Sequence, residues 1–174
     1  LPDGNILVTE RPGRLRVIRN GVLDPAPIGP LPQVLATGLG GLLDVALHPR
    51  FAQNRWIYLT YSKPGPGQGN ATTAVYRARW DGGATLADGK DIFVATSVKA
   101  AADQGIGPAT GSYGARFAWD RDGLLYVSLG ERNVPNTAQE PNTHLGKIVR
   151  IKDDGTVPAG NPFIGRAGYL PEIY

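Results

Sequence analysis

Short runs in which apolar and polar residues alternate are spaced along the chain, and turn residues separate them. The run Arg116–Asp120 alternates in this way, and Leu124–Leu129 continues the pattern after Asp122-Gly123. Alternation with a period of two is typical of a half-buried strand. The glycine of an Asp-Gly pair tolerates the positive φ that a tight hairpin turn requires. Residues 111–132 therefore predict a β-hairpin whose ends carry polar groups.

The same pattern predicts strands in most other parts of the chain. The further runs are Asn5–Glu10, Arg14–Asn20, Leu43–Pro49, Trp56–Tyr61, Thr72–Trp80, Ile92–Val98 and Lys147–Lys152. Two stretches, Lys63–Asn70 and Ala100–Gly111, are rich in Gly, Pro or Ala and lack strand periodicity, so we expect inserted loops there. With 24 Gly and 15 Pro, the composition also favours an all-β protein with many tight turns.

The strand pattern repeats. Residues 42–61 match the pattern of residues 114–129, and residues 3–21 match residues 122–155. Units of about four strands that repeat at intervals of tens of residues indicate the blades of a β-propeller. The interval is longer than the roughly 40–50 residues of common blades, which agrees with inserted loops.

We expect one partial propeller domain over residues 1–174. It comprises a partial blade at 1–37, a full blade at 38–100, a nearly full blade at 111–155 and a connecting segment at 156–174. Propellers close with about 4 to 8 blades, so two and a half to three four-stranded blades make about half of a six-bladed ring. Half a ring leaves exposed edges. We therefore expect a homo-oligomer in which two copies complete the ring, or a truncated chain; an open sandwich is the alternative fold.

Composition and charge exclude several classes of function. The net charge is +3, and the basic residues are scattered rather than clustered with aromatic residues, so we expect no nucleic-acid partner. The chain has no stretch of 18 apolar residues, so we expect no membrane span. The absence of Cys excludes disulfides and thiolate metal sites. The sequence begins at Leu1, contains no Met and has no signal-peptide pattern, so we expect it not to be a complete translation product.

The acidic turns and the histidines predict no metal or catalytic site by themselves. Asp120 and Asp122 match the first and third positions of a calcium loop, but Leu124 stands at the fifth, where an oxygen ligand is needed. We therefore expect no metal site in these turns. His48 and His144 are expected to have structural or surface roles.

Several runs together resemble one family, the soluble PQQ-dependent aldose sugar dehydrogenases, or glucose/sorbosone dehydrogenase family. They cover nearly the whole chain and lie at residues 1–17, Gly38–Tyr61, 111–132, His144–Phe163 and Pro171–Tyr174. The resemblance implies the N-terminal half of a six-bladed propeller, and a periplasmic or secreted protein. Members bind pyrroloquinoline quinone (PQQ) and Ca²⁺ at the top of the channel and oxidise the anomeric carbon of aldoses by hydride transfer to the quinone.

The resemblance also assigns candidate site residues, and two of these depart from the family pattern. Ser112 stands where the family has the His that is its proposed catalytic base, and Leu39 stands where it has a Gln that faces the quinone and the sugar. A serine hydroxyl without a partner base cannot accept a sugar proton near neutral pH, whereas imidazole titrates near 6.5. The cofactor-binding candidates are the positions of Leu39, Tyr113, Glu131, Arg132 and Asn133.

We therefore predict an aldose sugar dehydrogenase-like protein. Because Ser112 and Leu39 replace the family's His and Gln, we do not expect it to be an active sugar dehydrogenase. The family's remaining quinone and Ca²⁺ ligands belong to blades that follow Tyr174, so we do not expect this chain alone to bind PQQ or Ca²⁺. One alternative is a catalytically inactive half-propeller that acts as a binding or assembly module. Another is a homodimer of half-propellers that binds a small ligand, such as a sugar, in its channel.

Overall fold

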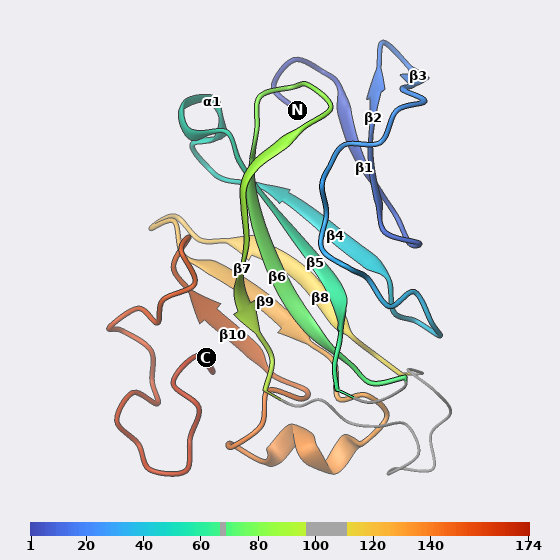
Figure 1. The fold of residues 1–174 in the computed structure, drawn as a ribbon. Helices are drawn as coiled ribbons and strands as arrows, with labels where there is room; N and C mark the ends of the chain where they lie inside the picture. Colours follow the sequence, from blue (N-terminus) through green and yellow to red (C-terminus); the bar gives the residue numbers. More distant parts are fainter. Residues whose placement is uncertain (67–68, 97–110) are drawn as a thin grey trace.

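Three antiparallel sheets make up nearly all the regular structure that the computed structural model describes, which covers residues 1–66, 69–96 and 111–174 (Figure 1). The strands are β1 (Ile6–Glu10), β2 (Arg14–Arg19), β3 (Val22–Leu23), β4 (Leu42–Leu47), β5 (Trp56–Pro64), β6 (Ala71–Trp80), β7 (Leu86–Val94), β8 (Gly114–Trp119), β9 (Leu125–Leu129) and β10 (Ile148–Ile151). The helices are short: α1 (Phe51–Asn54) and a 3₁₀-helix over Pro135–Gln139.

Each sheet is a meander of strands that follow one another in the chain. The first sheet has the order β1-β2-β3, the second β4-β5-β6-β7, and the third β10-β9-β8. Strand β1 packs beside β4, and β4 packs beside β8, so the first strands of the three sheets lie next to one another. This is how the inner strands of neighbouring blades meet around a propeller channel. The chain is therefore part of a β-propeller, as the repeat predicted.

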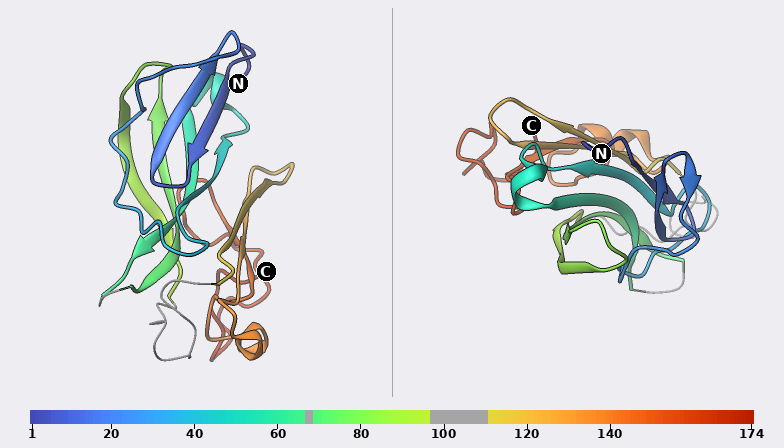
Figure 2. Two further views of the ribbon diagram at one scale, coloured as in Figure 1. Left: turned by 90° about the vertical axis from the view of Figure 1, so that its right-hand side faces the viewer. Right: turned by 90° about the horizontal axis from the view of Figure 1, so that it is seen from above.

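Apolar faces of neighbouring sheets form two main cores. Between the first and second sheets, Leu15 and Val17 of β2 are buried in one cluster with Ile57 and Leu59 of β5. Between the second and third sheets, the buried residues include Tyr58, Val75, Leu125, Val127, Val149 and Ile151. Successive side chains of a strand point to opposite faces, so Ile57 and Tyr58 of one strand serve different cores. The second sheet thus lies between the other two (Figures 1 and 2).

The predicted hairpin at residues 111–132 is confirmed. Strands β8 and β9 pair antiparallel, with Trp119 opposite Leu125. The turn between them places Gly123 at φ +78°, the left-handed region that Gly adopts without a Cβ penalty. The strand pattern is confirmed elsewhere as well, but the strand predicted at Ile92–Val98 begins earlier, at Leu86, and ends at Val94; residues 97 and 98 lie outside the described part.

The segment expected to be a connection, residues 156–174, ends by pairing with β10. Ile173 forms an antiparallel bridge with Val149. The Arg150 N–H donates to the Glu172 carbonyl at 2.8 Å, and the Tyr174 N–H donates to the Ile148 carbonyl at 2.9 Å. The outer edge of the third sheet is therefore covered by a short additional stretch of chain.

Large apolar side chains remain exposed on the first and third sheets. On the first they are Ile6, Val22 and Leu23, with Val22 71% exposed; on the third sheet and its covering stretch they are Ile148 and Tyr174. Ile6 and Leu23 both pair with Ile18, on the face of the first sheet opposite to the buried Leu15 and Val17, whereas Val22 pairs with Arg19 on the other face. None of the helices in the described residues is long and apolar enough to span a membrane.

Candidate functional site

The two segments that carry most of the candidate residues meet at one end of the third sheet. Residues 111–113 lead into β8, residues 130–133 follow β9, and the Gly130 N–H donates to the Tyr113 carbonyl at 3.0 Å. A Cβ atom on Gly130 would overlap the carbonyl of Ser112. The close approach of these two segments, 111–113 and 130–133, forms what we call the strand-end site.

Arg132 is the buried centre of the strand-end site. It is 8% exposed, and its guanidinium donates to the Ala71 carbonyl at 3.1 Å and to the Tyr113 hydroxyl at 2.9 Å. The guanidinium carbon also lies 3.7 Å from the centre of the Tyr113 ring. Burial lowers the pKa of Arg132 from its ordinary value. Arg132 therefore holds strand ends of the second and third sheets together.

Tyr113 is a core residue of the same site. Only 3% of it is exposed, and it packs in a small cluster with Ala71, Ala115 and the partly buried Leu35. Its carbonyl accepts a hydrogen bond from the Thr73 hydroxyl at 3.2 Å, and burial raises the pKa of its phenol. The structure thus places two cofactor-binding candidates, Tyr113 and Arg132, in packing contacts rather than at an open surface.

The other strand-end candidates are more accessible. Ser112 and Glu131 are half-buried, and Asn133 is exposed in the left-handed region at φ +59°. The Asn133 N–H donates to the Glu131 carboxylate at 3.2 Å. The backbones of residues 111–113 and 130–132 lie against each other, so these three more accessible polar residues stand on adjoining segments.

Leu39 lies in the loop between β3 and β4 and is 65% exposed. Leu35 of the same loop packs against the cluster that contains Tyr113, so this loop reaches the end of the molecule where the strand-end site lies. Its exposed side chain is apolar and offers no hydrogen bond at the position of the family's Gln.

A groove of about 250 Å³ runs along the inner strands, lined by Thr9 and Arg11, by residues 42–44 and by residues 114–116. Asp44 of β4 is bonded to β8 beside this groove: its carboxylate accepts a hydrogen bond from the Phe117 N–H at 3.1 Å and lies 3.3 Å from the Arg116 guanidinium. Sequence reasoning did not single out Asp44 or Arg116. Both residues lie on predicted strands, but nothing in the sequence shows that those strands adjoin.

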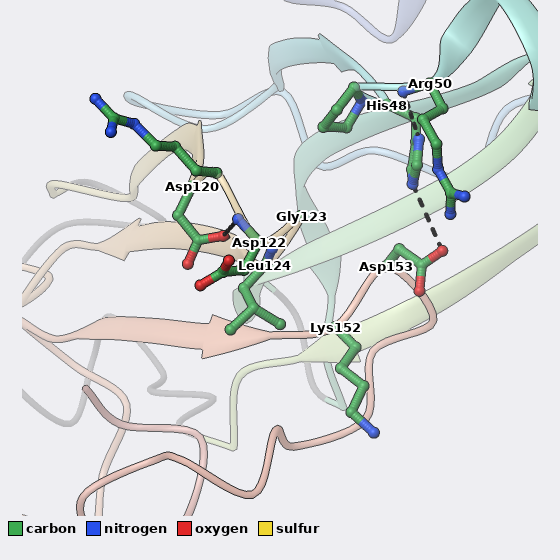
Figure 3. A pocket seen from close by; sticks show the side chains of 10 residues that line it. His48, Arg50, Asp120, Asp122, Gly123, Leu124, Lys152 and Asp153 are labelled. Carbon is green, nitrogen blue, oxygen red and sulfur yellow. Dashed lines mark hydrogen bonds and ion pairs between the residues drawn. The ribbon is translucent and has the colours of Figure 1, made fainter.

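A larger cleft, of about 480 Å³, lies between the loop after β4, the β8–β9 turn and the loop after β10 (Figure 3). His48 lines it although only 5% of the residue is exposed. Its Nδ1 accepts the Arg50 N–H at 2.9 Å and lies 2.8 Å from the Asn54 amide nitrogen. With Nδ1 accepting, the neutral ring carries its proton on Nε2, which lies 3.6 Å from the Asp153 carboxylate.

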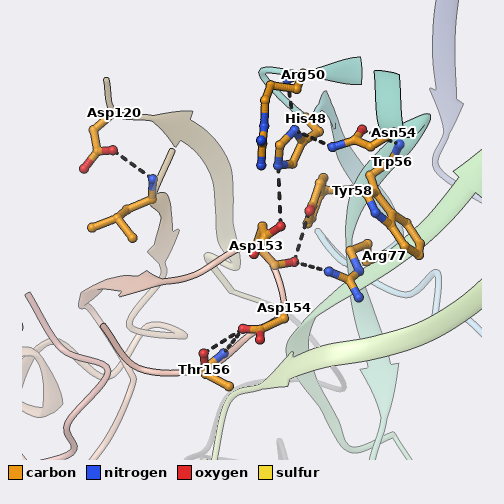
Figure 4. Close-up of polar contacts among 11 residues, drawn as sticks. His48, Arg50, Asn54, Trp56, Tyr58, Arg77, Asp120, Asp153, Asp154 and Thr156 are labelled. Carbon is orange, nitrogen blue, oxygen red and sulfur yellow. Dashed lines mark hydrogen bonds and ion pairs between the residues drawn. The ribbon is translucent and has the colours of Figure 1, made fainter. Parts of the chain in front are cut away.

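Asp153 also joins the second and third sheets through its backbone (Figure 4). Its carbonyl accepts hydrogen bonds from the Tyr58 hydroxyl at 3.0 Å and from the Arg77 guanidinium at 2.7 Å. Arg77 in turn lies 4.1 Å from the ring centre of Trp56, and burial raises the pKa of Tyr58 to about 12. The cleft residues therefore serve as a junction between sheets, and they account for the structural role expected of His48.

The second histidine, His144, is also part of an internal contact. It is 2% exposed, and its Nδ1 accepts the Thr96 N–H at 3.1 Å. Its Nε2 lies 3.5 Å from the Glu172 carboxylate, too far for a good hydrogen bond. Burial lowers the pKa of His144, with Glu172 opposing the shift.

The burial of His144 predicts a loss of stability in mild acid. A His whose pKa is lowered by folding stabilises the fold fully above its unfolded pKa near 6.5 and progressively less as the pH falls below it. We expect the free energy of unfolding, measured by urea titration, to fall between pH 7 and about pH 5. The fall should be smaller in His144→Gln. Equal pH dependence in the two proteins would contradict this role of His144.

Among the described residues of the strand-end site, Arg132 is the one cation, and it is engaged in contacts within the chain. No group of three His, Cys, Asp or Glu side chains in the described ranges is placed to hold a metal ion. The carboxylates of PQQ need free cations, whereas the Arg132 guanidinium is buried in contacts with Ala71 and Tyr113, and its Nε–H is enclosed without a partner. The accessible polar residues of the strand-end site are Ser112, Glu131 and Asn133.

Comparison with known proteins extends over the whole chain. A family model described as Glucose / Sorbosone dehydrogenase matches residues 1–174. The chain is 44% identical to the uncharacterized protein slr1608 of Synechocystis, which it covers over 44% of that protein's length. It is 41% identical to the aldose sugar dehydrogenase YliI of Escherichia coli, covering 45% of it. All of this chain is matched in both cases, so the chain spans about half the length of these relatives.

Solved structures agree with this coverage. The soluble aldose sugar dehydrogenase of Escherichia coli in its apo form superposes with a TM-score of 0.90 and 39% identity, over 100% of this chain and 48% of that one. The PQQ-bound form of the aldose sugar dehydrogenase of Streptomyces coelicolor superposes with a TM-score of 0.79 and 26% identity, over 100% and 47%. The arrangement of the three sheets is therefore shared with part of larger propellers.

Proposed function

Because the chain belongs to the Glucose / Sorbosone dehydrogenase family, we propose that it supplies three blades and one wall of the site in an aldose sugar dehydrogenase-like propeller. The observation that carries the proposal is the contact between residues 111–113 and 130–133 at one end of the third sheet, which the loop of Leu39 reaches through Leu35. In the complete site, PQQ would accept a hydride from the sugar. The family supports a periplasmic or secreted location.

We propose further that residues 1–174 do not oxidise sugar on their own. Oxidation of an aldose releases a hydroxyl proton that a base must accept, and Ser112 has no imidazole partner, since His48 and His144 are held in contacts elsewhere. The metal ion and the free cations for the quinone would have to come from further blades packed on the exposed sheet faces.

The test is sugar-dependent dye reduction by the purified chain mixed with PQQ and Ca²⁺. We expect no glucose-dependent rate above that of PQQ and Ca²⁺ without protein. The double variant Ser112→His, Leu39→Gln should restore little, because it adds neither a metal cluster nor a free cation. A rate that needs both the protein and glucose would contradict the proposal.

The exposed apolar side chains of the two end sheets favour a second candidate function, a homodimer that closes one ring from two copies. The first sheet of one copy would then cover the third sheet of the other, and burial of Ile6, Leu23 and Ile148 would stabilise the contact. Light scattering tests this directly. A mass near twice 18.5 kDa supports the homodimer, and a mass of one chain at every concentration rejects it.

A further inference from the structure

The loop that carries Leu39 is held by a side chain from a different sheet. Arg11 stands in the turn between β1 and β2, and its guanidinium reaches three carbonyls of the loop. Nε donates to the Gly40 carbonyl at 3.0 Å, while Nη2 donates to those of Gly38 at 2.6 Å and Ala36 at 3.3 Å. The guanidinium of Arg11 thus donates hydrogen bonds to backbone carbonyl oxygens rather than to a carboxylate.

The backbone of Arg11 is fitted against the same loop. The Leu42 N–H donates to the Arg11 carbonyl at 3.0 Å. A Cβ atom on Gly41 would come within 2.5 Å of that carbonyl oxygen and within 2.6 Å of the Arg11 side chain. Side chain and main chain of Arg11 therefore both lie in contact with residues 40–42.

The other tertiary hydrogen bonds of the loop hold its two ends. The Ser62 hydroxyl donates to the Leu35 carbonyl at 2.6 Å and accepts the Gly41 N–H at 2.7 Å. Between those ends, the hydrogen bond from the Gly40 N–H to the Thr37 carbonyl is local. In the described part of the chain, the tertiary hydrogen bonds to residues 36–40 come from Arg11.

We propose that Arg11 is a positioning residue: it sets the conformation of residues 36–40, and thereby the place of Leu39. The role in the site rests on the proposed function, but the hold on the loop does not. Arginine suits this task because its planar fork presents several donors in a fixed geometry. A lysine has one compact charge and cannot bond the same three carbonyls in one arrangement.

A spin label at position 39 reports the effect directly. The chain has no Cys, so Leu39→Cys gives a single attachment point for a nitroxide. We expect the electron paramagnetic resonance spectrum to show a restrained label in this background. Adding Arg11→Ala should shorten its rotational correlation time several-fold, and Arg11→Lys should give an intermediate value.

Arg14→Ala is the matched control. Arg14 lies on the same hairpin, and its side chain is 55% exposed and pairs with Glu10 of that hairpin. It should leave the label's motion unchanged. If Arg11→Ala also leaves the label as restrained as in the parent, or if Arg14→Ala frees it equally, the proposal is overturned.

Amide hydrogen exchange gives a second readout that does not require a label. Arg11→Ala should speed exchange of the Gly40 amide by about tenfold or more, because its hydrogen bond lies within the segment that Arg11 holds. The Gly41 amide, which the Ser62 hydroxyl holds, and the amides of β5 and β6 should change less. Unchanged exchange at Gly40 would overturn the proposal. Neither experiment contains quinone or sugar, so the outcome is independent of whether the proposed dehydrogenase function holds.

Discussion

Gly155→Ala is expected to destabilise the fold by about 3 kcal/mol or more. Gly155 lies at φ +91° in the loop after β10, and a Cβ atom there would overlap the carbonyl oxygen of Ile92 in β7. The carbonyl oxygen of Ile92 belongs to the backbone, so it cannot move aside by a side-chain rotation. The loop would have to lift from the second sheet, which would also weaken the hydrogen bonds that the Asp153 carbonyl accepts from Tyr58 and Arg77.

Gly123→Ala is the matched control for Gly155→Ala. Gly123 has a similar backbone conformation, φ +78°, but a Cβ atom there would meet nothing within 4 Å. It should lose only about 1 kcal/mol, from backbone strain. Urea denaturation followed by tryptophan fluorescence measures both variants. Equal losses would show that the contact between Gly155 and β7 does not contribute.

Arg132→Ala is expected to cost about 3 kcal/mol, because it removes two hydrogen bonds and a stacked cation from a buried site. The Ala71 carbonyl and the Tyr113 hydroxyl would lose their donor. Tyr113→Phe removes only the hydroxyl and should cost about 1 kcal/mol.

Arg121→Ala provides the control for Arg132→Ala, since Arg121 is an exposed arginine in the β8–β9 turn. It should change stability by less than about 0.5 kcal/mol. The same urea titration compares the three variants. A loss in Arg132→Ala no larger than that in Arg121→Ala would contradict the structural role assigned to Arg132.

Local patterns predicted most of the strands, because the alternation in β2, β5, β6, β8 and β9 is set by residues close in sequence. The first half of β7 was missed. Its residues 87–91 read Ala-Asp-Gly-Lys-Asp, which indicates a turn, but pairing with the long strand β6 extends the sheet through them. Strand β3 was missed because two residues are too few to show a period.

The residues of the candidate site were predicted from the family motif alone. The motif placed Ser112, Glu131 and Asn133 on two segments, and the structure shows that the backbones of these segments adjoin. It did not show that Tyr113 and Arg132 are buried against each other, because both residue types also suit an open pocket. The contacts of Arg11 and Asp153 were beyond sequence reasoning, since each joins segments whose neighbourhood is set by the packing of separate sheets.

We propose that these three blades form only one wall of a quinone site. Titrating PQQ into the purified chain in the presence of Ca²⁺, while the absorption spectrum of the quinone is recorded, tests this most directly. We predict the spectrum of free PQQ throughout, because the described residues offer neither a metal cluster nor a free guanidinium at the strand-end site. A saturable spectral shift with one quinone bound per chain would contradict the claim.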